Sequence, residues 1–261
     1  MSELAGPLDG PLVGKVALVT GAGQGVGQGI ALALAKAGAA VAVVGRTESK
    51  LVTTCRLIEQ AEGRARAYAC DVKSAAEVER TVAAVVAAFE GLDILVNNAY
   101  EGAFGPLLSL DDAAFMRGIE AGPLASFRFM KACHPHLKAR GGGNIVNLIT
   151  SAAQRWDAAN YGAYAVAKQG IRALTRAAAS EWGPDGIRVN NIAPHALSPA
   201  LEAWIKAGPE EAREFFKTIP LGRIGDCEDD IGRAVVALVG SDMHYLTGAT
   251  IPLDGGQAFF G

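Results

Sequence analysis

Residues 16–27 read VALVTGAGQGVG, a short apolar run followed by a turn that has glycine at 21, 23, 25 and 27. A pattern with helical periodicity begins directly after this turn. Glycine permits the tight turn and a close approach of the backbone to a phosphate, and the first N–H groups of a helix bind that phosphate. Strand, turn and helix in this order are the context of a dinucleotide-binding motif. We expect the cofactor to contact Gly21, Gln24, Gly25, Val26 and Gly27.

Apolar runs and alanine-rich stretches with helical periodicity alternate along the rest of the chain. The runs cover residues 16–19, 41–44, 94–96, 145–148 and 187–189, and the helical patterns include 30–37, 77–89, 163–179 and 229–239. Continuous apolar runs are typical of parallel strands that are covered on both faces. The alternation predicts right-handed βαβ units, and hence an α/β fold with a doubly wound parallel sheet, the Rossmann fold.

The chain is expected to contain one domain. Residues 1–12 are interpreted as a flexible N-terminal tail, and residues 13–261 as a single Rossmann-type domain that binds the dinucleotide and carries the catalytic groups. Residues 195–222 depart from the alternation and are rich in proline, alanine and glutamate. We predict that they form a small helical insertion over the carboxyl ends of the strands, where open α/β sheets bind ligands.

Composition argues against several classes of function. The net charge of −3 offers no basic surplus for nucleic acid, and no basic helix for an anionic membrane. The sequence has no signal-peptide pattern and no apolar stretch near the about 18 residues that a membrane span needs. The four cysteines have no metal-ligand or redox spacing, so we expect reduced thiols, no metal site and a cytoplasmic protein.

Five motifs in order resemble the short-chain dehydrogenase/reductase family, classical type. They are Thr-Gly-x-x-x-Gly-x-Gly at 20–27, Asn97-Asn98-Ala99, Tyr164-x-x-x-Lys168, the run NNIAP at 190–194, and Thr247-Gly248 with Asp254-Gly255-Gly256. The resemblance spans residues 12 to 256 or so and implies hydride transfer between a nicotinamide cofactor and a carbonyl compound or alcohol. It also implies cofactor contacts at Asp71, Val72, Asn98, Ala99, Tyr164, Lys168, Pro194, Ala196 and Leu197.

The end of the second strand bears on the choice of dinucleotide. An acid at this point bonds the ribose 2′-hydroxyl in NAD-selective Rossmann proteins. Here Gly45 takes the place of the acid and Arg46 follows. An arginine can pair with a 2′-phosphate, so the sequence favours NADP(H) over NAD(H). A solvated Arg46 with NAD(H) as the cofactor is the alternative.

The proposed catalytic residues are Ser151, Tyr164 and Lys168. Tyr164 and Lys168 are four residues apart in a helical pattern and share one face. The resemblance implies that Tyr164 exchanges a proton with the substrate oxygen, while the Lys168 charge lowers the tyrosine pKa and its ammonium holds the nicotinamide ribose. For the hydroxyl that orients the substrate, the spacing to Tyr164 favours Ser151, and the spacing to Asn147 indicates Thr150.

Three positions depart from the family pattern. Gly122 stands where the family has a helix asparagine that supports a water feeding protons to the lysine, and Pro123 after it is expected to kink the helix. Tyr100 and His195 replace glycines, either as packing residues or to narrow the pocket and contact substrate. The candidate substrate-contacting residues are Tyr100, Thr150, Trp156 and His195.

Together these features predict an oxidoreductase in which Tyr164 is the general acid or base. The aromatic residues Phe104, Trp156 and Trp204 near the expected pocket indicate a hydrophobic ketone or secondary alcohol as the small-molecule substrate. The alternatives are an NADP(H)-binding sensor or scaffold with little or no activity, and the same chemistry with NAD(H). The resemblance further implies a homotetramer or homodimer.

Overall fold

Seven parallel strands form one sheet with the order β3-β2-β1-β4-β5-β6-β7 in a computed structural model that describes residues 10–155 and 159–259. The strands are β1 (Val16–Thr20), β2 (Ala40–Gly45), β3 (Arg64–Ala69), β4 (Ile94–Asn97), β5 (Gly143–Leu148), β6 (Ile187–Pro194) and β7 (Thr250–Leu253). The order reverses between β1 and β4, which places a topological switch point at their carboxyl ends. The predicted doubly wound Rossmann fold is confirmed.

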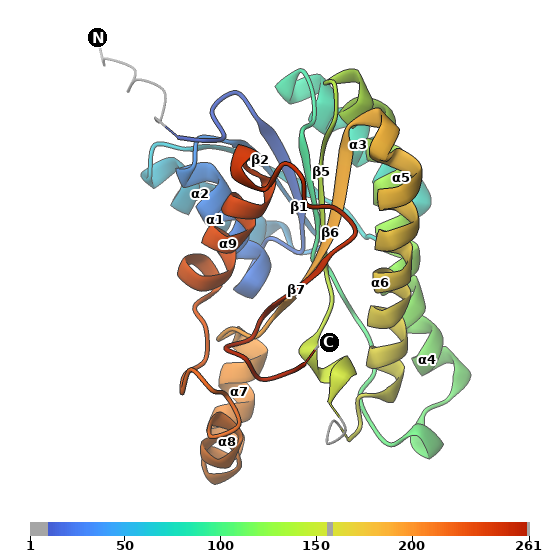
Figure 1. Ribbon diagram of the computed structural model, residues 1–261, viewed down its shortest axis with the longest axis vertical. Helices are drawn as coiled ribbons and strands as arrows, with labels where there is room; N and C mark the ends of the chain where they lie inside the picture. Colours follow the sequence, from blue (N-terminus) through green and yellow to red (C-terminus); the bar gives the residue numbers. More distant parts are fainter. Residues whose placement is uncertain (1–9, 156–158, 260–261) are drawn as a thin grey trace.

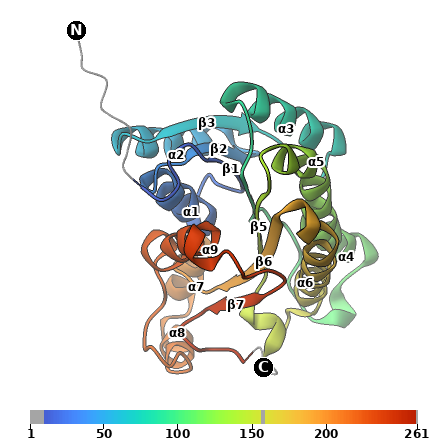
Figure 2. The same ribbon diagram turned by 45° about the horizontal axis from the view of Figure 1, so that its top comes forward.

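Helices cover both faces of the sheet (Figures 1 and 2). On one face lie α1 (Gly25–Lys36), α2 (Glu48–Gln60) and α9 (Arg233–Val239), and on the other lie α3 (Ala75–Phe89), α4 (Asp112–Ile119), α5 (Ala125–Ala139) and α6 (Gly162–Trp182). Short 3-10 turns occur at η1 (Leu107–Ser109), η3 (Ser151–Gln154), η4 (Gly183–Asp185) and η6 (Ser241–Met243), and a π-helix, η5 (Cys227–Gly232), precedes α9. No described helix is both long enough and apolar enough to cross a bilayer.

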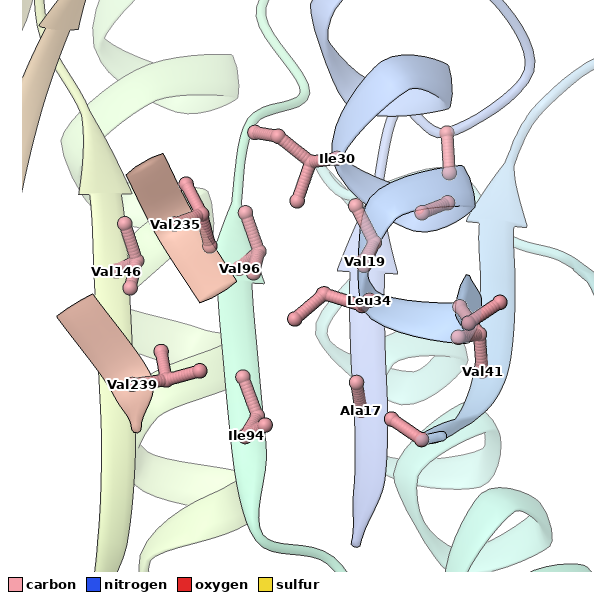
Figure 3. Close-up of a cluster of buried hydrophobic side chains, with 14 of the residues drawn as sticks. Ala17, Val19, Ile30, Leu34, Val41, Ile94, Val96, Val146, Val235 and Val239 are labelled. Atoms are coloured by element: carbon pink, nitrogen blue, oxygen red, sulfur yellow. The ribbon is translucent and has the colours of Figure 1, made fainter. Parts of the chain in front are cut away.

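The two faces of the sheet have separate hydrophobic cores, because successive strand residues point to opposite faces. Val19 of β1, Ile30 and Leu34 of α1 and Val235 of α9 belong to one core, and Figure 3 shows Val235 beside Val96 of β4 and Val146 of β5. Leu18, the neighbour of Val19, belongs to the second core, beneath α3 and α5. Burial on both faces explains why these strands are apolar throughout.

The edge strands and the N-terminus differ from the sequence-based expectation. β3 has the sequence RARAYA with exposed and half-buried residues in alternation, so the edge strand lacks the apolar run that marks an inner strand. Leu12, assigned to the flexible tail, is buried, and its N–H donates to the Ala37 carbonyl over 2.9 Å. The ordered chain therefore begins before residue 13, and residues 1–9 of the predicted tail lie outside the described residues.

The predicted insertion at residues 195–222 forms α7 (Pro199–Ala207) and α8 (Pro209–Phe216). The Ser198 hydroxyl caps α7 by accepting from the Leu201 N–H. Both helices lie beyond the carboxyl ends of the strands in Figure 1, at the edge where the sheet presents its ligand-binding side.

Pro123 lies within a continuous helical segment and does not end it. The backbone instead widens into a π-helix, η2 (Glu120–Leu124), which joins α4 to α5 with right-handed helical angles at both joints. A π turn changes the hydrogen-bond spacing and so accommodates a residue that has no N–H to donate. The interruption expected at Pro123 therefore takes the form of a π-helix.

A chain of buried polar side chains links four strands to α6. The Asn97 amide donates to Asn147 over 2.8 Å, and Asn147 donates to the Thr175 hydroxyl over 2.8 Å. Thr175 in turn donates to Asn191 over 2.7 Å, and Asn191 donates to Thr250 over 3.3 Å. The chain fixes β4, β5, β6 and β7 relative to α6, directly behind the carboxyl ends that build the site.

Candidate active site

The glycine turn between β1 and α1 is held from β4. Gly21 and Gly25 have φ of +65° and +57°, a region that side chains disfavour. The Asn98 amide donates to the carbonyls of Thr20 and Gly21 over 2.9 and 3.1 Å. A Cβ on Gly27 would overlap this amide. The turn therefore presents its backbone in one fixed shape.

A cleft of about 420 Å³ opens at this turn, over the switch point between β1 and β4. Its lining includes eleven of the predicted residues: Gly21, Gln24, Gly25, Val26, Gly45, Arg46, Asp71, Val72, Asn98, Ala99 and Tyr100. Gly27 packs beneath the turn, and Pro194, Ala196 and Leu197 lead from β6 to Ser198, which lines the cleft. Bare backbone at the start of α1 and a cleft that runs along the strand ends fit a dinucleotide.

Charged side chains at the cleft were missed by the sequence reasoning. The Glu101 carboxylate pairs with Arg46 over 2.6 Å and with Lys73 over 3.5 Å. The Lys50 ammonium donates to Gln24 over 2.6 Å. No motif marks Glu101, Lys73 or Lys50, because the contacts join segments that are distant in the sequence. This part of the cleft contains three cations and one pairing carboxylate.

Tyr164 and Lys168 lie on the face of α6 that packs against β5. The Lys168 ammonium is buried and donates to the Leu148 carbonyl over 2.8 Å. Burial lowers the pKa of Lys168 to about 7. Burial also raises the pKa of Tyr164 to about 12, although a hydrogen bond with Thr150 opposes this shift. The expected lowering of the Tyr164 pKa is therefore not observed here, because burial is the largest influence on this phenol.

The two candidate hydroxyl donors point in different directions. Ser151 donates to the buried Asp254 carboxylate over 2.5 Å, and that carboxylate also accepts the Gly256 N–H over 3.1 Å. Thr150 is the residue whose hydroxyl interacts with Tyr164. The preference for Ser151 from its spacing does not match this geometry, because the 3-10 turn that begins at Ser151 directs its hydroxyl toward β7.

Tyr100 lies against the Tyr164–Lys168 pair and beside Gly122. The Tyr100 ring meets the Tyr164 ring edge-on, with centroids 4.9 Å apart, and its centroid lies 4.7 Å from the Lys168 nitrogen. A Cβ on Gly122 would lie 3.4 Å from the ring. Gly122 thus makes room for the Tyr100 ring. The two residues, which both depart from the expected family pattern, are in contact.

Aromatic side chains extend from Tyr164 and from the insertion. The Phe104 ring lies 5.2 Å from the Tyr164 ring, and the His195 ring lies 5.3 Å from Phe215 of α8. Burial lowers the pKa of His195, and its Nδ1 is buried with no partner among the described residues. Trp204 packs on Phe215 at 5.4 Å. Trp156 lies outside the described residues.

Metal ligation has no support in the part of the chain that the structure describes. Within residues 10–155 and 159–259, no three histidine, cysteine, aspartate or glutamate side chains are grouped closely enough to hold an ion.

Comparison with known proteins indicates the family of this chain. A family model described as enoyl-(acyl carrier protein) reductase matches residues 21–258. A 12α-hydroxysteroid dehydrogenase from a Clostridium species is 39% identical over 252 residues, 94% of this chain and 96% of that protein. A D-threitol dehydrogenase from Mycolicibacterium smegmatis is 36% identical, with 97% of this chain and 96% of that protein covered.

A solved structure extends the comparison to three dimensions. A 7α-hydroxysteroid dehydrogenase complexed with NADH and 7-oxo glycochenodeoxycholic acid has a TM-score of 0.90 and 32% identity, and the match covers 99% of this chain and 98% of that one. This chain belongs to the short-chain dehydrogenase/reductase family. It is an NAD(P)-dependent oxidoreductase of the kind that acts on alcohols and ketones.

Proposed function

We propose that this enzyme transfers hydride between NADP(H) and a hydrophobic ketone or secondary alcohol, with Tyr164 as the general acid or base. The observation that carries the proposal is the grouping of Tyr164, Lys168 and a hydroxyl beside the dinucleotide cleft. Because burial raises the pKa of Tyr164 to about 12, the phenol is protonated at neutral pH. It is therefore ready to give its proton to a carbonyl oxygen.

The residues of the site divide the work of the reaction. A bound nicotinamide supplies the hydride, or accepts it in the reverse direction. Tyr164 protonates the oxygen at which negative charge develops, and a neighbouring hydroxyl orients that oxygen by donating a hydrogen bond. The buried Lys168 places its cation next to Tyr164 and would hold the ribose of the cofactor. The Asn98 amide keeps the glycine turn in shape for the pyrophosphate.

Replacement of the acid tests the proposal directly. Tyr164→Phe keeps the ring and removes the proton, so kcat should fall about a thousandfold, within the range of general acid catalysis. The measurement is oxidation of NADPH against cyclic, aromatic and steroid ketones. Tyr161→Phe removes a hydroxyl from the neighbouring tyrosine and serves as the matched control. Equal turnover by wild type and Tyr164→Phe would show that the assigned role is wrong.

The hydroxyl that orients the substrate is assigned to Thr150 in this proposal, and Ser151 is its alternative. Thr150 interacts with Tyr164, whereas Ser151 donates to Asp254. Thr150→Val should lower kcat about a hundredfold, and Ser151→Ala should have the smaller effect. The opposite order would return the role to Ser151.

The preference for NADP(H) depends on Gly45 and Arg46 at the end of β2. No acid occupies Gly45 to repel a 2′-phosphate, and Arg46 lines the cleft. Since the related 7α-hydroxysteroid dehydrogenase was solved with NADH, the proposal relies on this chain's own residues. Arg46→Ala should weaken NADPH binding about tenfold and leave NADH binding nearly unchanged. An unchanged NADPH affinity would favour NAD(H).

The substrate class follows from the aromatic side chains and from the names of the relatives. Phe104, Phe215 and Trp204 offer apolar faces on the two sides of the expected substrate position, and two of the similar proteins are named for hydroxysteroids. A bulky cyclic alcohol or ketone fits these surroundings better than a small polyol. In the ketone panel, steroid and other polycyclic ketones should therefore give the highest kcat/KM.

A binding protein with little or no activity is the second candidate. The loss of the helix asparagine at Gly122 favours it, because the usual support for proton supply to the lysine is missing. Calorimetric binding of NADPH without turnover of any ketone in the panel would support a sensor or scaffold. Turnover that disappears in Tyr164→Phe would exclude it.

The assembly and location complete the proposal. Met116, Phe127 and Val166 are large apolar side chains that remain exposed on α4, α5 and α6, and such surfaces are typical of interfaces between subunits. We infer a homodimer or homotetramer, which light scattering of the purified chain would detect. The four free cysteines fit a reducing compartment such as the cytoplasm.

A further inference from the structure

We propose that the Tyr100 ring positions the Lys168 ammonium in this enzyme, at the place where the family pattern has the side chain of residue 122. Tyr100 acts through Lys168 and is therefore a positioning residue. The catalytic importance of Lys168 is part of the proposed function, but its placement by Tyr100 can be measured without turnover.

The contacts of Lys168 show how little else holds its nitrogen. Among the described residues, its one hydrogen bond is to the Leu148 carbonyl, over 2.8 Å. The other near neighbours are two ring faces, Tyr100 at 4.7 Å and Tyr164 at 5.7 Å from the nitrogen to the ring centroid. An aromatic face attracts a cation within about 6 Å, and most strongly where water is excluded. The Tyr100 ring is the nearer of the two.

Three glycines form a socket that locks the Tyr100 ring in place. A Cβ on Gly102 would overlap the Tyr100 hydroxyl, and a Cβ on Gly118 would lie 2.9 Å from it. A Cβ on Gly122 would lie 3.4 Å from the ring carbon Cε2 and 3.4 Å from the Ala167 side chain. Gly118 and Gly122 lie one turn apart on the α4–η2 helix, so the helix surface is flat where the ring rests against it.

The ring, and not the hydroxyl, is the part of Tyr100 that serves the site. Its hydroxyl is buried between Gly102 and Gly118 and has no hydrogen-bond partner among the described residues. Burial, and then the nearby Tyr164, raise the pKa of Tyr100 to about 12. A hydroxyl in this position does not reach the Lys168 nitrogen as a donor or acceptor. Phenylalanine should therefore serve as well as tyrosine at position 100.

The surroundings of Lys168 allow its protonation to report on the ring. The titratable groups that face it are Tyr100, from the loop after β4, and Tyr164, from its own helix. β5 contributes a carbonyl, and Gly122 of the π-helix η2 packs against the Tyr100 ring without a side chain of its own. When an apolar group replaces the Tyr100 ring, the Lys168 ammonium stays buried but loses the attraction of the ring face. The charged form is then less stable, so the pKa of Lys168 should fall.

The test measures the protonation of Lys168 in the full-length, ligand-free protein. Lysine labelled with ¹³C and ¹⁵N is titrated by NMR, and the Lys168 signal is assigned by its absence from Lys168→Met. Tyr100→Leu should lower the pKa of Lys168 by about one unit, a tenfold change in proton affinity that corresponds to about 1.4 kcal/mol. Tyr100→Phe should shift it by no more than about 0.3 units.

Control variants separate the ring from general disturbance of the fold. Tyr161→Leu removes another ring near Tyr164, 6.0 Å between centroids, and should leave the pKa of Lys168 unchanged. Tyr100→Met offers a second apolar replacement if Tyr100→Leu does not fold. An unchanged or higher pKa of Lys168 without the ring, or equal shifts in Tyr100→Phe and Tyr100→Leu, would overturn the proposal. Each of these outcomes is independent of whether a substrate has been identified.

Discussion

Two polar clusters lie on the same helix, α6, and are built in opposite ways. Around Thr175 the hydroxyl accepts from Asn147 over 2.8 Å and donates to Asn191 over 2.7 Å, and all three side chains are fully or almost fully buried. Around Lys168, seven residues earlier, the described part of the chain offers the nitrogen one hydrogen bond and two ring faces. The polar groups around Thr175 are hydrogen-bonded to one another, whereas the Lys168 amine makes fewer hydrogen bonds to the described residues than it has hydrogens to donate.

The difference distinguishes polar groups that stabilise the fold from polar groups that take part in the reaction. A buried group with all its partners contributes to stability, whereas an unpaired one costs about 1–3 kcal/mol. The cost at the second cluster is visible in the pKa of Lys168, which burial lowers to about 7. A site that must exchange protons keeps this capacity open for the cofactor and substrate. The comparison therefore predicts opposite responses to substitution at the two clusters.

The largest effect is expected for Lys168→Met, which should lower kcat about a thousandfold. The free energy of unfolding at pH 7 should not fall, because the substitution removes a buried amine that is held by a single hydrogen bond. Steady-state kinetics with NADPH and urea denaturation measure the two quantities. If Lys168→Met lost as much stability as Thr175→Val, the two clusters would not differ in the way proposed.

Thr175→Val should show the reverse behaviour. It leaves the Asn147 donor and the Asn191 acceptor without their partner, so the free energy of unfolding should fall by about 3 kcal/mol. The kcat of the folded enzyme should stay within a few-fold of wild type. Thr53→Val, which removes an exposed hydroxyl on α2, is the matched control and should change stability by less than about 0.5 kcal/mol. Loss of kcat without loss of stability in Thr175→Val would contradict the structural assignment.

The pH dependence of stability provides a third test. Lys168 has a folded pKa of about 7 and an ordinary value of 10.5, so the unfolded chain binds more protons between these values. Stability should therefore rise with pH across this window. Lys168→Met lacks this contribution, and the stability of wild type relative to it should grow by roughly 3.5 kcal/mol from pH 7 to 10. Urea denaturation at several pH values measures the difference, and a constant difference would show that the amine is not desolvated.

The smallest effect is expected for Tyr100→Phe. Because the Tyr100 hydroxyl is buried without a partner, its removal should raise the free energy of unfolding by about 1 kcal/mol. Thermal unfolding measures this gain, and Tyr164→Phe, which removes a hydroxyl that interacts with Thr150, is the comparison. A loss of stability in Tyr100→Phe would show that this hydroxyl has a hydrogen-bond partner. Tyr100 would then resemble the hydrogen-bonded side chains around Thr175.

The parts of the site that were predictable from the sequence are local in the chain. The glycine turn follows from a dozen consecutive residues, and the Tyr164–Lys168 pair follows from helical spacing. The family and the doubly wound sheet were also correctly predicted, since apolar runs and motif order carry that information. The edge strand β3 was missed because alternating residues such as those in RARAYA do not form an apolar run.

The features that the sequence did not predict depend on contacts between distant segments. Tyr100 and Lys168 are 68 residues apart, and only the packed fold brings the ring over the nitrogen. The choice between Thr150 and Ser151 depends on side-chain direction in a 3-10 turn, which residue counting cannot supply. The π-helix at Pro123 was not predicted, because the residue pattern does not distinguish it from an α-helix interrupted by proline.

The glycine socket also constrains the order in which this enzyme could change by substitution. A Cβ on Gly122 already lies 3.4 Å from the Tyr100 ring and from Ala167, so a side chain longer than alanine has no room there while the tyrosine is present. Residue 100 must become small before residue 122 can grow. In the opposite direction, residue 122 must lose its side chain before a ring can enter. The two positions therefore form a two-step exchange whose intermediate, with small residues at both, has an open space beside the lysine.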